Sequence, residues 1–339
     1  MATMKDVATR AGVSVATVWR VRNEPDAVRA DTLAKVLAAI EELHYVPDQL
    51  ASSLRSRQTG TIALLFPTIA NAFWTTIARG VEDKGEARGY SVFLCNTDDD
   101  PAKEARYLDV LLQRRVEGIA IVPTAASAAA LQQARRHQMP IVQLHRRIDD
   151  VGADSIRADS RGGAAALTEQ LLALGHRRVG FLGGFPTISP SRDCLAGYAG
   201  AMARANLPVE SALVCLGRST PEVGYALTAA LLAGDRPEAL CIGNSRLAVG
   251  ALHALAEAGV RVPEDMAVAT FYDIAALDAY SPALITAVQP AYDIGRLGAR
   301  RLLARIDGLA APPDDMLLAN TVARRAPRRL DAVGAAASG

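Results

Sequence analysis

The sequence predicts a small all-α domain of the helix-turn-helix type, followed by an α/β core of two doubly wound lobes with parallel sheets. In the first 60 residues, apolar side chains recur at helical spacing on both sides of Gly12. After Gly60, short apolar runs alternate with amphipathic segments, and this alternation restarts after Asp159. A chain of 339 residues, 50% of them hydrophobic, is long enough to fill more than one core.

The N-terminal segment has the spacing of two helices joined by a tight turn. Val7 and Ala8 predict the inner face of a first helix, Gly12 allows a sharp bend, and Ser14 can cap a second helix. The side chains left facing outward combine methyl, hydroxyl, indole and guanidinium groups, which suit the thymine methyls, guanine edges and phosphates of DNA. We therefore interpret seven residues as DNA-contacting: Ser14, Val15, Ala16, Thr17, Trp19, Arg20 and Arg22.

Charge supports this interpretation by its position and not by its amount. The net charge is only +1, so composition alone does not indicate a nucleic-acid partner. Arginines nevertheless recur in the segments expected to face DNA, whereas Glu41 and Glu42 lie on a third helix expected over 32–43. Besides Arg20 and Arg22, these arginines are Arg10, Arg29, Arg55 and Arg57.

The core is expected to bind a small molecule between its lobes. Buried strands are predicted over 61–66, 91–95, 118–122 and 141–144, with helices over 72–88, 101–115 and 125–137. The second lobe should contain helices over 159–174 and 191–205, a strand over 178–182, and strands near residues 213, 240, 268 and 286. Sheets of this kind bind ligands beyond the carboxyl ends of their strands, so the cleft between the lobes is the expected site.

Enzyme and metal-site motifs are missing. The run 180–184 is not a GxGxxG motif, 243–247 lacks the closing glycine of a nucleophile elbow, and neither HExxH nor a P-loop occurs. The four cysteines form no CxxC pair, and the acidic run 98–100 before Pro101 is typical of a helix N-cap. We therefore predict a protein that is not an enzyme and that needs no cofactor or metal.

The chain also gives expectations for location and for its C-terminal end. No uninterrupted apolar stretch approaches 18 residues, and the first residues lack an apolar signal-peptide region, so we expect a cytoplasmic protein. The tail over 327–339 is rich in alanine and glycine, and we expect it to be disordered.

The N-terminal pattern, with the third helix over 32–43 and its exit over 44–47, resembles the LacI/GalR (lactose repressor) family of bacterial transcription regulators. Residues 48–55 are similar to the hinge helix of that family, and the segment from Gly60 onward resembles its effector-binding core. The resemblance covers about 320 residues in collinear order. It implies an operator-specific repressor, homodimeric or tetrameric, that binds double-stranded operator DNA and a small-molecule effector in the interlobe cleft.

The resemblance also implies how the chain is divided. Residues 1–47 would form the helix-turn-helix domain, 48–60 the hinge helix and linker, and 61–326 a core similar to a periplasmic sugar-binding protein. The chain would cross between lobes near Asp159, Gln289 and Ala319. Lobe one would then comprise 61–158 and 289–318, and lobe two 159–288 and 319–326.

Three hinge residues acquire a role at the minor groove from the resemblance. Leu54 matches the leucine that enters between base pairs and bends the operator, with Ala51 allowing close approach and Arg55 beside it. Because Ser52 and Ser53 flank Leu54, we prefer this role to a buried core position.

Effector contacts are likewise implied by the resemblance. Phe73 and Trp74 follow the first strand, where the family places such contacts, and Arg192 lies in a segment similar to a known effector-contacting one. The expected set is Phe73, Trp74, Thr124, His145, Asp159, Arg192, Cys194, Ser245 and Tyr272.

Several positions depart from the pattern of the family. The family often has arginine at Cys194, aspartate at His145, Ser245 and Tyr272, and asparagine at Ser160. A site with fewer hydroxyl-binding groups but with Arg192 and aromatic rings favours a sugar acid or other small carboxylate, although a sugar is the usual effector. On the DNA side, Trp19, Arg29 and Asp48 replace a serine, a capping serine and an asparagine, which suggests a different operator or docking angle.

Three other interpretations stay open at this point. The effector could act as a corepressor and strengthen DNA binding. The chain could be a small-molecule binding module without genuine DNA function, or an enzyme built on the same fold.

Overall fold

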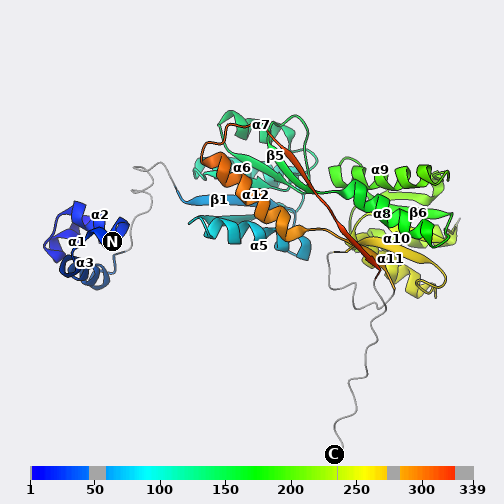
Figure 1. The fold of residues 1–339 in the computed structure, drawn as a ribbon, viewed down its shortest axis with the longest axis horizontal. Coiled ribbons are helices and arrows are strands. Elements are labelled where there is room, and N and C mark those ends of the chain that lie inside the picture. Colours follow the sequence, from blue (N-terminus) through cyan, green and yellow to red (C-terminus); the bar gives the residue numbers. More distant parts are fainter. Residues whose placement is uncertain (1, 46–58, 235, 273–282, 325–339) are drawn as a thin grey trace, which may run out of the picture. The chain divides into compact units, whose positions relative to one another are not determined.

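The computed structural model describes residues 2–45, 59–234, 236–272 and 283–324 (Figure 1). The chain forms two compact units, Met1–Thr59 and Gly60–Gly339. The second unit contains two six-stranded sheets, which define lobe one and lobe two. None of the described helices has the length and apolar character needed to cross a membrane.

The first unit is a three-helix domain made of α1 (Met4–Ala11), α2 (Val15–Asn23), a 3-10 turn (Pro25–Ala27) and α3 (Ala30–Glu42). As predicted, Gly12 ends α1 in the left-handed region with φ 65°, and the Ser14 hydroxyl caps α2 by accepting from Thr17 N at 3.1 Å. Val7, Val18 and Val36 are fully buried at the centre of the domain. Arg29 stands at the N-cap position of α3, where the family has a capping serine, and its side chain makes no capping hydrogen bond.

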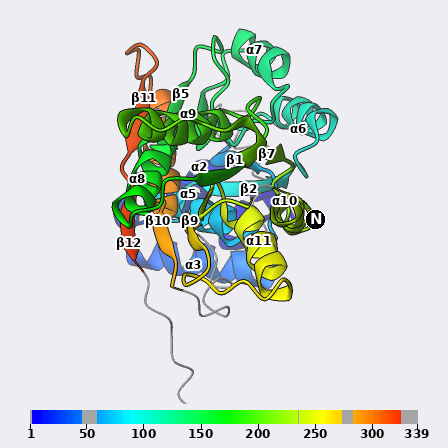
Figure 2. The ribbon, with the colours of Figure 1, turned by 90° about the vertical axis from the view of Figure 1, so that its right-hand side faces the viewer.

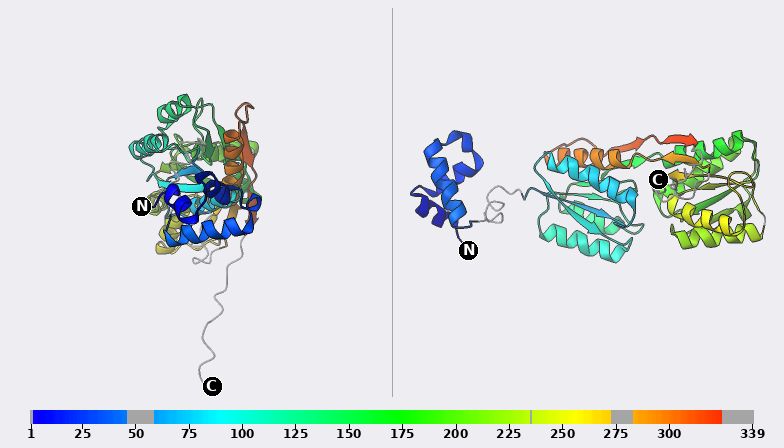
Figure 3. Two further views of the ribbon diagram at one scale, coloured as in Figure 1. Left: turned by 90° about the vertical axis from the view of Figure 1, so that its left-hand side faces the viewer. Right: turned by 90° about the horizontal axis from the view of Figure 1, so that it is seen from below.

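Lobe one is a sheet covered on both faces by helices. Its strands are β1 (Thr61–Phe66), β2 (Ser91–Asn96), β3 (Gly118–Ile121), β4 (Ile141–Leu144), β5 (Asp154–Ala158) and β11 (Asp315–Leu318). They are parallel and follow the order β11-β5-β4-β3-β1-β2. Helices α5 (Ala72–Glu86) and α12 (Ala291–Ile306) pack on one face, as Figure 3 shows, and α6 (Pro101–Gln113) and α7 (Ala128–Arg136) pack on the other.

Lobe two repeats this plan with its own core. Its strands are β6 (Val179–Gly184), β7 (Val214–Gly217), β8 (Ala239–Ile242), β9 (Ala267–Tyr272), β10 (Ile285–Val288) and β12 (Thr321–Arg324). The order is β12-β10-β9-β8-β6-β7, and only β12 is antiparallel to its neighbour among the described strands. One face carries α8 (Ser160–Ala173) and α9 (Ser189–Arg204), and the other carries α10 (Pro221–Ala233) and α11 (Ser245–Glu257) (Figure 2).

The chain passes between the two sheets three times among the described residues. Strand β5 of lobe one is followed by α8 of lobe two, β10 of lobe two is followed by α12 of lobe one, and β11 is followed by β12. These passages bracket residues 159, 289–290 and 319–320. The two-lobed doubly wound architecture predicted from the sequence is confirmed.

Three strands were not predicted from the sequence. Strands β5, β11 and β12 are short and contain charged residues, so they lack the apolar runs that mark β1 or β3. Strand β5 is fully buried in spite of Asp154 and Arg157, because ion pairs from distant parts of the chain satisfy both.

Candidate functional site

A pocket of about 590 Å³ lies where the carboxyl ends of strands from both sheets meet the N-terminal ends of helices. Lobe one contributes residues that directly follow β1, β2 and β4, and lobe two contributes residues at the ends of β6, β7 and β8. Five lining residues lie at the N-terminal ends of helices: Asn71 at α5, Ser160 at α8, Ser191 at α9, Thr220 at α10 and Asn244 at α11. The pocket therefore collects helix N-termini, whose free amides favour acceptor and anionic groups.

One wall of the pocket is a compact cluster of three rings. Phe73 and Trp74 lie in the first turn of α5, and the ring of His145 packs edge-on against both, with centroid distances of 4.7 and 5.3 Å. His145 is only 9% exposed, and its Nδ1 has no hydrogen-bond partner among the described residues. Burial, together with the charges of Arg146 and Arg157, lowers the pKa of His145 to about 3, so its imidazole is neutral at pH 7.

The charged side chains that line the pocket form ion pairs on lobe one but not on lobe two. Asp99 forms an ion pair with Arg146 at 2.5 Å, and Asp98 forms one with Lys103 at 2.6 Å. The Arg146 guanidinium also lies 5.7 Å from the centroid of the Trp74 ring. On the lobe-two side, Arg218 and Arg246 line the pocket without an ion pair to any described residue. The pocket thus presents compensated charge on lobe one and uncompensated positive charge on lobe two.

The N-terminal domain presents a mixed surface along α2. Val15 and Trp19 are 44% and 41% exposed, which is unusual for side chains of this size, and Arg20 and Arg22 are exposed on the same helix. Ser14 and Ala16 are also exposed. Thr17 is half-buried, and its hydroxyl shares a 2.8 Å hydrogen bond with Ser14. This surface combines apolar groups with cations, as direct reading of base edges and phosphates requires.

Known proteins resemble the chain along most of its length. Residues 3–48 match the model of the lacI family of bacterial regulatory proteins, and residues 168–326 match a periplasmic binding protein-like domain. The ribose operon repressor of Escherichia coli (strain K12) is 37% identical over 308 residues, which cover 90% of this chain and 93% of the relative. The chain belongs to the lacI family.

Other relatives and a solved structure agree with this assignment. The HTH-type transcriptional repressor PurR of Haemophilus influenzae (strain PittEE) is 35% identical over 90% of this chain and 91% of its own length. The crystal structure of the lac repressor dimer bound to operator and the anti-inducer ONPF has a TM-score of 0.85 and 28% identity, and the match covers 95% of this chain and 98% of that one. As a family member, this chain is a DNA-binding transcription regulator under the control of a small-molecule effector.

The structure brings together five of the nine residues expected to contact the effector. Phe73, Trp74, His145, Cys194 and Ser245 all line the pocket. The Cys194 thiol is buried and points to the carbonyl oxygens of Ser160 and Gly243 at 3.7 and 3.8 Å. Because burial raises the pKa of this thiol well above its usual value, Cys194 supplies a neutral packing group and not a nucleophile.

Three expected residues are not part of the pocket wall. Thr124 is buried, and its amide and hydroxyl both donate to Glu104. Asp159 caps α8 by accepting from Gly162 N at 2.8 Å. Arg192 is directed away from the wall, with its side chain 51% exposed and 3.9 Å from Asp149.

The displacement of Arg192 has a simple helical cause. Ser191 and Cys194 line the pocket and are three residues apart on α9, so they share a face, whereas Arg192 is turned by about 100° from Ser191. Arg192 therefore does not line the pocket in this structure, and its contact with an anionic effector stays a prediction. Tyr272 ends β9, but its side chain lies outside the described part of the chain.

Sequence reasoning missed the arginines that do line the pocket. Arg146 lies two residues after β4, Arg218 directly follows β7, and Arg246 is in the first turn of α11. Accurate strand ends would have indicated all three, because residues at the carboxyl ends of parallel strands meet at one edge.

Arg10 forms an ion pair with Glu42 of α3, with an Nη2–Oε2 distance of 2.6 Å, and its side chain is 55% exposed. The hinge residues Ala51, Leu54 and Arg55, and also Arg57, lie outside the described residues.

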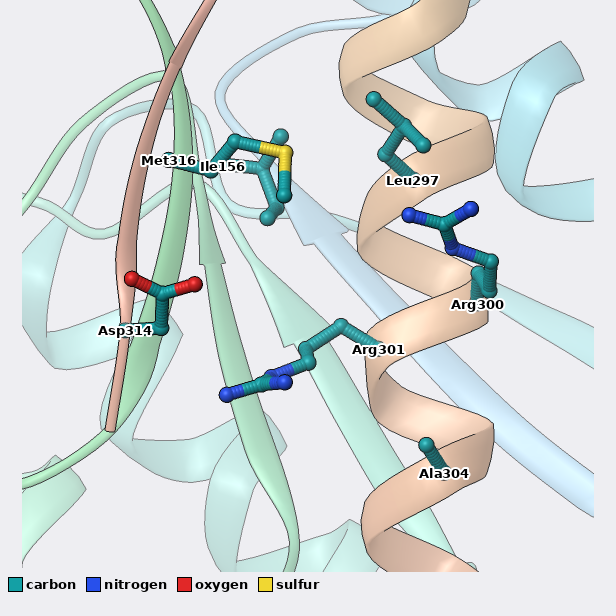
Figure 4. A pocket seen from close by; sticks show the side chains of 7 residues that line it. All are labelled: Ile156, Leu297, Arg300, Arg301, Ala304, Asp314 and Met316. Atoms are coloured by element: carbon teal, nitrogen blue, oxygen red, sulfur yellow. The ribbon is translucent and has the colours of Figure 1, made fainter. Parts of the chain in front are cut away.

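A second, smaller cavity of about 260 Å³ lies in lobe one between α12 and β11 (Figure 4). Ile156, Leu297 and Met316 form its apolar side, and Arg301 crosses toward the strands. Arg301 is occupied by Asp154, to which it donates from Nε at 2.9 Å. Arg301 thus compensates the charge of the buried Asp154 carboxylate. We therefore regard the larger pocket as the better effector site.

Proposed function

We propose that this regulator is an operator-specific repressor whose effector binds the pocket between the lobes. The observation that carries the proposal is that both lobes contribute lining side chains, among them Trp74 and Arg146 from lobe one and Arg218 and Arg246 from lobe two. A ligand that contacts both walls has different contact energies in different lobe arrangements, and it can therefore shift the equilibrium between them. Operator affinity and effector affinity are then coupled reciprocally.

On the DNA side, we assign the reading of base edges to exposed residues of α2 between Val15 and Arg20. Exposed Val15 and Ala16 supply methyl groups, Trp19 supplies an indole, and Arg20 supplies a guanidinium that can bind guanine. We assign the minor-groove contacts to Leu54, Ala51 and Arg55 by their match to the hinge of the family. Because its target is chromosomal DNA, we place the protein in the cytoplasm.

The chemistry of the relatives supports an effector of low molecular weight. The E. coli relative is named for the ribose operon and the H. influenzae relative is a repressor named PurR. A pocket of about 590 Å³ lies within the range of small-molecule sites. Polar side chains of the pocket, such as Asn71, Ser160 and Gln289, can bind hydroxyl groups.

Fluorescence anisotropy with DNA from upstream of the gene tests the proposal. The full-length protein should bind this DNA with a steep salt dependence and prefer it to scrambled DNA, and a panel of small metabolites should contain a compound that changes this affinity. The substitution Ser191→Trp fills the pocket and should abolish the response to the compound but not DNA binding. Ser211→Trp, at an exposed position outside the pocket, is the matched control.

Each outcome of this experiment decides one part of the proposal. Binding that does not distinguish upstream from scrambled DNA contradicts an operator-specific repressor. A compound response that survives Ser191→Trp contradicts the pocket assignment. A compound that strengthens DNA binding identifies a corepressor, and one that weakens it identifies an inducer.

A further inference from the structure

We propose that the effector carries a doubly charged anionic group, of which a phosphate monoester is the simplest, and that Arg218 and Arg246 bind this group. The inference rests on the assignment of the interlobe pocket as the effector site. It replaces the earlier expectation of a carboxylate held by Arg192, which is not part of the pocket wall.

The charge balance of the described pocket wall is the first argument. Asp98 is bound by Lys103 and by the amide of Asn96, and Asp99 is bound by both terminal nitrogens of Arg146. The acidic side chains of the wall are therefore compensated by cations of lobe one. Two positive charges remain, on Arg218 and Arg246.

Neither of these guanidinium groups has an anionic partner among the described residues. Glu222, in the first turn of α10, is close enough to Arg246 for its pKa to sense that charge, but the two form no ion pair within 4 Å. Arg246 is half-buried, so it is already partly removed from water. Arg218 is exposed. A neutral ligand that covers the two guanidinium groups would remove them further from water without giving them an anionic partner, which is unfavourable.

The N-termini of the two helices next to these arginines reinforce the positive field: Arg218 lies between β7 and α10, and Arg246 lies in the first turn of α11. Thr220 and Asn244 cap α10 and α11, and the Asn244 amide donates to the Ser219 hydroxyl at 3.1 Å, so the two helix starts are joined directly. A Cβ atom placed on Gly250 of α11 would lie 1.8 Å from the Pro221 carbonyl oxygen of α10, so only glycine permits the two helices to approach this closely. Two parallel sets of helix N-terminal amides thus face the same end of the pocket as Arg218 and Arg246.

The opposite wall fits an uncharged body attached to the anionic group. His145 is neutral, and Phe73 and Trp74 offer apolar surface beside it. Asn71, which caps the helix of Phe73 and Trp74, supplies a hydrogen-bonding group at this side. Two uncompensated cations match a dianion better than a singly charged carboxylate, and a guanidinium group binds phosphate oxygens through two parallel hydrogen bonds.

Isothermal titration calorimetry on the full-length protein tests the inference with four probes: D-ribose 5-phosphate, inorganic phosphate, D-ribose and D-gluconate. We expect the phosphate ester to bind at least tenfold more tightly than D-ribose and D-gluconate, and inorganic phosphate to bind weakly and compete with it. The double substitution Arg218→Gln and Arg246→Gln should weaken binding of the ester by about 100-fold, because two charge-assisted interactions are lost.

The controls separate a lost binding site from a damaged protein. Arg135→Gln with Arg136→Gln removes two exposed arginines at the end of α7 and should leave the affinity for the ester unchanged. Both double variants should bind operator DNA in the absence of ligand as the unmodified protein does. A folded Arg218/Arg246 variant that binds the ester with unchanged affinity overturns the inference, as does the absence of binding by both phosphate probes.

The test also distinguishes this inference from the proposed function. If D-ribose or D-gluconate binds most tightly and changes operator affinity equally in both double variants, the effector pocket stands and the dianion is wrong. If an effective ligand keeps its action in Ser191→Trp, the pocket assignment fails, and the inference fails with it.

Discussion

Arg157 of β5 in lobe one forms an ion pair with Asp193 of α9 in lobe two, with 3.2 Å between Nη1 and Oδ2. Arg157 is almost completely buried, and Asp315 also binds it through two further nitrogens. Near this pair, the backbone amide of Arg147 in lobe one donates to the Ser189 hydroxyl in lobe two at 2.9 Å. The lobes are therefore connected by side-chain contacts in addition to the three chain passages.

The first prediction concerns this contact between lobes. Asp193→Asn removes the charge that Arg157 meets across the cleft, but Asp315 still satisfies Arg157, so the free energy of unfolding should change by less than about 1 kcal/mol. Because the contact belongs to one arrangement of the lobes, the effector concentration for half-maximal response should shift by about threefold. Dose–response curves of operator binding measure this shift.

Asp149→Asn is the matched control for this prediction. Asp149 also faces lobe two, but its distance to Arg192 is 3.9 Å and both side chains are half exposed, so its loss should change the response much less. An Asp193→Asn protein with an unaltered effector response would show that the pair does not distinguish between lobe arrangements.

The second prediction is a pH dependence that arises from His145. Burial lowers the pKa of His145 to about 3 in the folded protein, whereas in the unfolded chain a histidine has a pKa near 6.5. Between these values the unfolded chain binds more protons, so the free energy of unfolding must fall as the pH falls from 6.5. One such group contributes up to about 1.4 kcal/mol per pH unit.

Urea unfolding of the core between pH 4.5 and 6.5 measures this slope. His145→Asn should reduce it, whereas His137→Asn, at the exposed end of α7, should not. This pH range lies above the pKa of Asp315, so protonation of that carboxylate does not contribute to the slope. Burial raises the pKa of Asp315, but hydrogen bonds from Arg157 and Ser155 and nearby positive charges outweigh burial and hold this pKa at about 2. Equal slopes for both histidine variants would contradict a neutral buried His145.

The third prediction concerns Asp154, which is 1% exposed and accepts hydrogen bonds from Arg301 and Arg305 of α12. Asp154→Asn should lower the free energy of unfolding by about 2 to 4 kcal/mol, because two partly buried guanidinium groups lose their anion. Asp307→Asn breaks a half-exposed pair with Arg88 and should cost less than about 1 kcal/mol. Thermal unfolding of the two variants compares these values, and equal losses would refute a structural role for burial of Asp154.

The strand that contains Asp154 could not be predicted from the sequence, whereas the strands made of apolar runs could. Strands β1, β3 and β4 are apolar runs, so local pattern was sufficient to predict them. Strand β5 is equally buried, but its charges are acceptable only because α12, far along the chain, places Arg301 and Arg305 next to it. No local pattern contains that information.

The candidate pocket shows the same limit. Phe73 and Trp74 were predicted because they directly follow the first apolar strand, where ligand sites of this fold occur. Arg192 was placed in the wall by resemblance alone, although the face that a side chain occupies on α9 depends on packing against α8. The sequence does not show that Arg218 and Arg246 lack an ion-pair partner, because this depends on Asp98 and Asp99 being paired with Lys103 and Arg146 in the folded chain.

The last prediction separates two exposed arginines of α2. Arg20 and Arg22 are two residues apart, so they lie about 200° from each other around the helix and cannot both face the base edges. Arg20→Ala should change the ranking of operator variants by about 1 to 3 kcal/mol at one base pair, as the loss of a bidentate base contact does. Arg22→Ala should weaken binding to all sequences alike and reduce the salt slope by about one. Competition binding over single-base operator variants, repeated at several salt concentrations, measures both effects. If Arg20→Ala weakens every variant equally, Arg20 contacts phosphate, and α2 docks in the groove with a different face from the one proposed.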